Sequence, residues 1–95
     1  MRIEIDLTEV RSKETFHDII QENMECPPYY GRNLDALYDV LTSYCEPVQL
    51  YFEGYMDFAQ DLPGYGSAFK DMCLEAMAEN HDLEIYFDQE LVEED

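Results

Sequence analysis

Two carboxylates, Asp35 and Asp39, are spaced one helical turn apart, and their type and spacing suggest either catalysis or electrostatic binding. Tyr38 and Thr42 share their stripe, because positions i, i+3, i+4 and i+7 of a helix face the same way. Paired carboxylates act as acid and nucleophile in some hydrolases. This pair lies on a convex helix face without basic or polar substrate-binding neighbours, so a hydrolase site is the weakest interpretation. Electrostatic binding of a cationic partner is the stronger one.

The acidic excess of the whole chain indicates the same kind of partner. Among 95 residues, 23 are Asp or Glu and 5 are Lys or Arg, which gives a formal net charge of −18. Nucleic acids and anionic membranes are bound through clustered Lys and Arg, so this balance argues against both. From Asn33 to the end of the chain, Lys70 is the only Lys or Arg. The acidic helix faces there are therefore either ordinary solvated faces or surfaces whose charge a cationic partner compensates.

The remaining candidate groups form no recognisable catalytic or metal site. His17 and His81 lie far apart, and neither has a metal-ligand spacing. The segment Gly64-Tyr65-Gly66 lacks the third glycine and the preceding strand of a dinucleotide-binding fingerprint, and it is predicted to be a turn. We therefore expect no cofactor, no metal and no enzymatic activity.

Cysteine usage and the N-terminus indicate the compartment. The cysteines are odd in number and widely spaced: Cys26, Cys45 and Cys73. This pattern predicts free thiols in a reducing cytoplasm rather than a disulfide scaffold or a zinc ribbon, with Cys73 in the core. The first residues lack the apolar run of a signal peptide, and no stretch approaches the roughly 20 apolar residues of a membrane-spanning helix. A cytoplasmic protein is expected.

The hydrophobic pattern predicts the elements that position these residues. Alternation of Ile3, Ile5 and Leu7 predicts a strand over 2–7. Further strands are expected at 48–52 and 83–87, and helices between 12 and 27, from 33 to about 42, at 56–60 and at 67–80. Helices between strands favour parallel pairing. We predict an α/β fold, a three-stranded parallel sheet packed with helices in the order β-α-α-β-(α)-α-β, as one domain over 1–88 with a frayed acidic tail over 89–95.

Two further features are expected near the helix that carries Asp35. Four tyrosines cluster around it in the sequence: Tyr29, Tyr30, Tyr38 and Tyr44. Tyrosine on a polar surface is favoured at interfaces, because it buries area and keeps a hydrogen bond. The later long helix carries a second acidic ridge opposite its apolar stripe: Asp71, Glu75 and Glu79.

The segment Pro28-Tyr29-Tyr30-Gly31-Arg32-Asn33-Leu34-Asp35-Ala36-Leu37-Tyr38-Asp39 resembles the signature of the barstar family, the intracellular inhibitors of barnase-type ribonucleases. It joins a tyrosine loop, a glycine, Asn33 as the predicted N-cap of the following helix and two acids in fixed register. The resemblance extends over nearly the whole chain, to about Phe87. It implies a barstar-like fold and a monomer that plugs the positively charged active site of a small basic ribonuclease in a 1:1 complex.

The resemblance also implies roles for individual residues. Asp39 would occupy the site of an RNA phosphate and meet the catalytic cations of the enzyme, and Asp35 would meet its basic guanine-binding side. Tyr29 would stack on the catalytic histidine, and Gly31 and Asn33 would shape the loop. The remaining contacts would come from Tyr38, Thr42 and Tyr44, and from Glu75 on the later helix.

Some positions leave alternatives open. Tyr38 and Tyr44 stand where the best-known member of the family has Trp, so the cognate enzyme is not identified. The Glu46–Pro47 bond resembles the site of a cis-proline in the family and is predicted to be cis. The alternative function is an acidic interaction protein, a nucleic-acid mimic or a toxin antidote, for a different basic partner.

Overall fold

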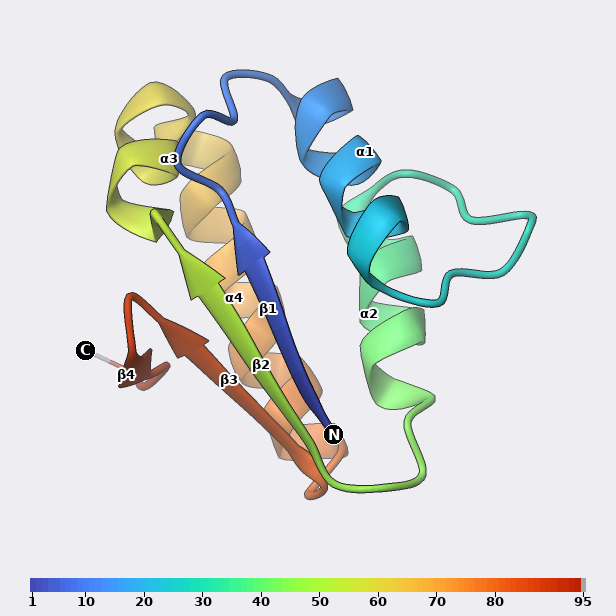
Figure 1. The fold of residues 1–95 in the computed structure, drawn as a ribbon. Helices are drawn as coiled ribbons and strands as arrows, with labels where there is room; N and C mark the ends of the chain where they lie inside the picture. The colour runs from blue at the N-terminus through green and yellow to red at the C-terminus, as the bar shows by residue number, and fades with distance from the viewer. Residues whose placement is uncertain (95) are drawn as a thin grey trace.

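The computed structural model describes residues 1–94 and shows a four-stranded sheet with helices against it (Figure 1). The elements in chain order are β1 (Arg2–Asp6), α1 (Lys13–Asn23), α2 (Leu34–Thr42), β2 (Val48–Glu53), α3 (Tyr55–Asp61), α4 (Pro63–Glu79), β3 (Leu83–Phe87) and β4 (Glu90–Leu91). β1, β2 and β3 pair in parallel in that order, and β4 pairs antiparallel with β3. The predicted α/β class and the predicted order of the first seven elements are confirmed, whereas the sheet has four strands, one of them antiparallel, rather than three parallel strands.

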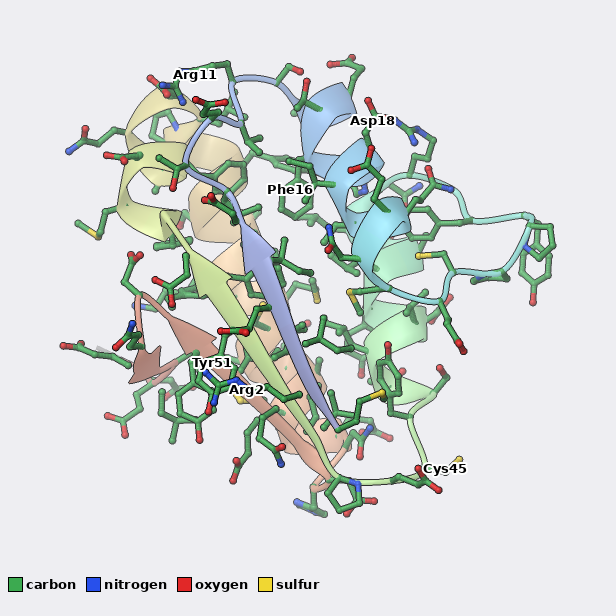
Figure 2. The ribbon with its side chains drawn as sticks, viewed as in Figure 1. Arg2, Arg11, Phe16, Asp18, Cys45 and Tyr51 are labelled. Carbon is green, nitrogen blue, oxygen red and sulfur yellow. The ribbon has the colours of Figure 1, made fainter. Side chains whose placement is uncertain are left out.

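The helices cover one face of the sheet, and the core lies between the two layers (Figure 1). In β2, Val48, Leu50 and Phe52 are buried, whereas the residues between them are half-buried and point to the other face. On that face Arg2 lies over the ring of Tyr51, 4.0 Å from its centroid (Figure 2). This alternation is the pattern expected of a sheet that is packed on one side.

Aromatic rings from three helices pack against one another in the core. Phe16 of α1 packs 5.1 Å from Phe58 of α3 and 5.0 Å from Phe69 of α4, measured between ring centroids. Figure 2 shows Phe16 directed from α1 into the interior. Cys73 is fully buried, as predicted. Within residues 1–94, no helix has both the length and the apolar character needed to span a membrane.

The fourth strand, β4, was not predicted, because residues 89–95 were expected to form a frayed tail. The chain reverses at Asp88 and Gln89, whose φ angles are 50° and 72°. Positive φ at both central residues is the geometry of a two-residue hairpin, which in most sequences is signalled by glycine. Here the Asp88 carboxylate accepts the Gly54 N–H at 2.7 Å and fixes the turn. Val92 is consequently buried, and Asp95 lies outside the described residues.

Two local predictions were wrong. Gly64-Tyr65-Gly66 belongs to the first turns of α4 rather than to a free turn, because Pro63 occupies the first helical position, where its fixed φ is favourable. The Glu46–Pro47 bond is not cis. The trans form is the lower-energy isomer of X–Pro by about 0.5–1 kcal/mol. In this geometry the Pro47 carbonyl accepts a hydrogen bond from the Met1 amino group at 2.9 Å.

Candidate functional site

α2 presents the two predicted acids to solvent because the core takes up its apolar side. Leu37, Val40 and Leu41 are buried, which leaves Asp35 and Asp39 on the exposed side. No ion pair among the described residues involves either carboxylate. Like charges at this spacing repel each other by a few tenths of a kcal/mol. The repulsion is therefore uncompensated in the free protein.

Asn33 determines where α2 begins. Its backbone is extended, and its side-chain Oδ1 accepts a hydrogen bond from the Ala36 N–H at 2.8 Å. This is an N-cap, and it satisfies one of the free N–H groups of the first turn. The predicted capping role of Asn33 is confirmed. Because the cap sets where α2 begins, it also sets the direction in which the Asp35 side chain projects from the helix.

Tyr38, Thr42 and Tyr44 lie half-buried beside this acidic side. The Thr42 hydroxyl donates to the Tyr38 carbonyl at 2.9 Å, so it is engaged within the helix. Burial raises the pKa of the Tyr44 hydroxyl, and the nearby Cys26 and Glu25 raise it further. Tyr44 therefore remains a neutral hydrogen-bonding group at physiological pH.

The segment 24–33, which we call the tyrosine loop, connects α1 to α2 and directs two adjacent tyrosines oppositely. Tyr29 is 86% exposed, whereas Tyr30 is 7% exposed. The Tyr30 hydroxyl lies 2.7 Å from Nδ1 of His17, which is buried on α1, and burial raises the pKa of Tyr30. The inner tyrosine thus anchors the loop, and the outer one is available to a partner.

Arg32, two residues after Tyr30, attaches the end of the tyrosine loop to α1. Its guanidinium lies 2.7 Å from the Asp18 carboxylate and donates to the Glu14 carbonyl at 3.0 Å and to the Gln21 side chain. All three acceptors belong to α1. The positive charge of Arg32 is therefore paired on α1.

A hollow of about 550 Å³ lies between the tyrosine loop and α2. It is lined by Glu25, Pro27, Tyr29, Tyr30, Gly31, Ala36, Asp39, Val40 and Ser43. The lining contains two carboxylates, those of Glu25 and Asp39, and no Lys or Arg. Its apolar walls and acidic groups suit a cationic side chain with an apolar or aromatic part.

Glu75 comes from a different element. It is exposed on α4, and it is not among the residues that line the hollow. Asn80, at the C-terminal end of α4, donates to the carbonyls of Leu41 and Tyr44 at 3.1 and 3.0 Å. These bonds fix the end of α4 beside the end of α2, so Glu75 lies on a helix that neighbours α2.

The structure thus brings Tyr29, Gly31 and Asp39 together around one hollow and places the other predicted residues on or beside α2. Sequence reasoning missed Glu25 and Arg32, which lie in a loop without periodic pattern. It also assigned no role to His17, although His17 precedes Ile20 by three residues on a buried helical stripe. That spacing was the available signal of burial. Among residues 1–94, no group of His, Cys, Asp and Glu is arranged to hold a metal ion.

The fold and the site together define a small α/β domain with an acidic, tyrosine-bearing surface and, among the described residues, no group arranged to hold a metal ion. The model of the family described as "Barstar (barnase inhibitor)" matches residues 1–91. The chain therefore belongs to the barstar family. It is similar to a protein of Bacillus subtilis (strain 168) named "Putative ribonuclease inhibitor YrdF", with 33% identity over 82 residues, 85% of this chain and 90% of the relative.

Proposed function

We propose that this protein inhibits a small basic ribonuclease by filling its active site with the tyrosine loop and the exposed side of α2. The observation that carries the proposal is the hollow, where Tyr29 and Asp39 meet without any cation in the lining. Family membership and the relative's name support a ribonuclease inhibitor rather than an enzyme. Inhibition by occupancy needs no catalytic group and no cofactor.

The proposed contacts are those of the acidic and aromatic surface. Asp39 takes the place of an RNA phosphate, Asp35 meets the basic guanine-binding side, and Tyr29 stacks on the catalytic histidine of the enzyme. The rest of the proposed surface is Gly31, Asn33, Tyr38, Thr42, Tyr44 and Glu75, and we add Glu25 because it lines the same hollow as Asp39. One copy binds one enzyme, in the cytoplasm, through an interface of standard size, about 1,600 Å² in total.

Electrostatics explains why the acids need not be paired in the free protein. Uncompensated carboxylates attract a cationic enzyme from a distance and raise the association rate, an effect that salt screens. Once water is excluded from the interface, each carboxylate favours binding only if it is paired with a cation and hydrogen-bonded. The repulsion between Asp35 and Asp39 is then relieved by the partner.

The test is an RNA-cleavage assay against a panel of small basic guanyl-preferring ribonucleases at two salt concentrations. The parent protein is compared with Asp39→Asn and with the matched control Asp57→Asn, because Asp57 is exposed on α3 and changes the net charge equally. We expect Asp39→Asn to lose inhibition and Asp57→Asn to keep it. Equal inhibition by both variants contradicts the proposal, and affinity that follows total charge alone favours the acidic mimic instead.

A further inference from the structure

We propose that Arg32 is a positioning residue, which holds the tyrosine loop so that Tyr29 and Asp39 share one binding surface; this inference rests on the proposed function. Arg32 is the only Lys or Arg between Lys13 and Lys70 in the sequence. It belongs to the loop that is proposed to meet a cationic enzyme, where a positive charge directed outward would oppose binding. The structure directs this charge to α1 instead.

Three acceptors on a single helical face receive the Arg32 side chain. They are the Glu14 carbonyl, the Asp18 carboxylate and the Gln21 side chain. Positions i, i+4 and i+7 lie along one side of a helix, so a single guanidinium spans two turns of α1. Arginine presents several donors in a rigid fork, and lysine offers only one point charge, so the arrangement is specific to arginine.

A second contact holds the same stretch of the loop from the inside. Tyr30 is bonded to the buried His17, and Arg32 is bonded to the half-exposed Asp18, the next residue of α1. Only Gly31 separates the two anchors in the loop. Tyr29 precedes them and projects into solvent beside the hollow. The position of Tyr29 therefore follows from two anchors on α1, one on either side of Gly31.

The backbone of Arg32 provides an independent observation. Its φ is 55°, in the left-handed region that residues other than glycine rarely adopt. Such conformations persist where the surrounding contacts over-determine them, often at functional sites. Glycine would adopt this backbone freely, so the turn alone does not require arginine. The α1 contacts are what an arginine adds at this position.

Loss of the anchor should lower the fraction of molecules whose loop is competent to bind, and the apparent Kd rises in inverse proportion to that fraction. The key variant is Arg32→Gly, which keeps the backbone turn accessible and removes the anchor. We expect binding to a ribonuclease that the parent inhibits to weaken about tenfold, the typical effect of ordering one or two side chains on binding. We also expect faster backbone amide exchange in residues 28–33 of the free protein.

The change in net charge in Arg32→Gly acts against the expected loss of binding, so weaker binding cannot be attributed to charge. Arg32→Gly makes the protein more acidic by one unit, and that alone would speed association with a cationic enzyme. Arg11→Ala is the matched control, because Arg11 forms a comparable exposed pair with Asp61 at 3.0 Å. Figure 2 shows Arg11 by α3, well separated from Asp18. We expect Arg11→Ala to bind with the affinity of the parent and to associate at the same rate or slightly faster. Asp18→Asn should loosen the loop as Arg32→Gly does.

Amide exchange and affinity separate the possible outcomes. Faster exchange together with weaker binding in Arg32→Gly supports the proposal. Unchanged affinity overturns it, and so does weaker binding with unchanged exchange, because Arg32 would then act by direct contact with the enzyme. Failure of the proposed function has a different signature: Asp39→Asn would bind as the parent does, or no ribonuclease would bind at all. Even if the proposed function fails in this way, parent-like amide exchange in Arg32→Gly would show that Arg32 does not anchor the loop.

Discussion

The Nδ1 atom of His17 lies 2.7 Å from the hydroxyl of Tyr30, and its Nε2 atom lies 2.6 Å from the hydroxyl of Tyr65. The imidazole is 1% exposed. A neutral histidine donates through one ring nitrogen and accepts through the other. One of the two tyrosine hydroxyls therefore accepts a hydrogen bond from His17, and the other donates one to it. This single side chain therefore joins α1, the tyrosine loop and the start of α4, and its charge state is coupled to folding.

We predict that stability falls as the pH drops from about 6.5 to about 4 because of His17. The pKa of His17 is lowered from 6.5 to about 4, chiefly by burial and also by the Arg32 charge, while Asp18 partly opposes the change. In this window the unfolded chain binds a proton that the folded chain excludes, so unfolding becomes easier as pH falls. The contribution is about 3 kcal/mol, present in full above pH 6.5. Denaturant unfolding at several pH values measures it.

The control for this prediction is His17→Gln, which does not titrate and can still hydrogen-bond both tyrosines. The difference in unfolding free energy between parent and variant should depend on pH between 4 and 6.5 and be constant above. The many carboxylates titrate equally in both proteins and cancel in the difference. A pH-independent difference would contradict the assignment.

Tyr29 and Tyr30 should respond oppositely to substitution. Tyr29→Ala removes an exposed ring, so we expect the unfolding free energy to change by less than about 0.5 kcal/mol while inhibition weakens. Tyr30→Phe leaves a His17 nitrogen without its partner, which costs about 1–3 kcal/mol of stability. Thermal unfolding and a ribonuclease assay on both variants test this. A large stability loss in Tyr29→Ala would show that the ring has a structural role.

Removing Asp39 should separate stability from binding. Asp39→Ala relieves the repulsion with Asp35, so thermal stability should be unchanged or raised by a few tenths of a kcal/mol. Binding should weaken by about 3–5 kcal/mol, because the enzyme's cations would be left buried without a partner. Calorimetric unfolding and equilibrium titration of the variant measure the two effects. Parent-like affinity would rule out the role proposed for Asp39.

Glu25 should contribute to affinity although the sequence did not indicate it. It shares the hollow with Asp39, so Glu25→Gln should weaken ribonuclease binding. The loss should shrink at high salt. Glu22→Gln on α1 is the matched control, because Glu22 is exposed and does not line the hollow. Equal effects of the two substitutions would remove Glu25 from the site.

The end of the chain should contribute to stability. Val92 is 6% exposed and its N–H is bonded to the Ile85 carbonyl at 2.9 Å, whereas Leu91 is 45% exposed. Val92→Ala removes about two buried methylene equivalents and should cost about 1–2 kcal/mol. Leu91→Ala, the neighbouring control, should cost much less. Denaturant midpoints of the two variants decide whether this segment is packed or frayed.

Local pattern predicted most of the elements because their apolar residues repeat at strand or helical spacing. The alternation through Ile3 and Ile5 gave β1, and the Asn33 cap with Leu37 and Leu41 gave α2. β4 was missed because its hairpin has no glycine and is fixed by a contact between Asp88 and Gly54, 34 residues apart. A long-range hydrogen bond leaves no periodic trace in the sequence.

For the site, the sequence by itself determined the charge, the exposed stripe of Asp35 and Asp39, and the tyrosines before it, since these follow from composition and helical spacing. Tertiary structure alone decided that Tyr30 turns inward to His17 while Tyr29 stays outside. It also decided that Arg32 gives its charge to α1 and that Glu25 joins Asp39 at one hollow. The physical reason is that loop conformation depends on which distant acceptors satisfy its polar groups. Only the folded arrangement of α1 and α2 brings those acceptors within reach.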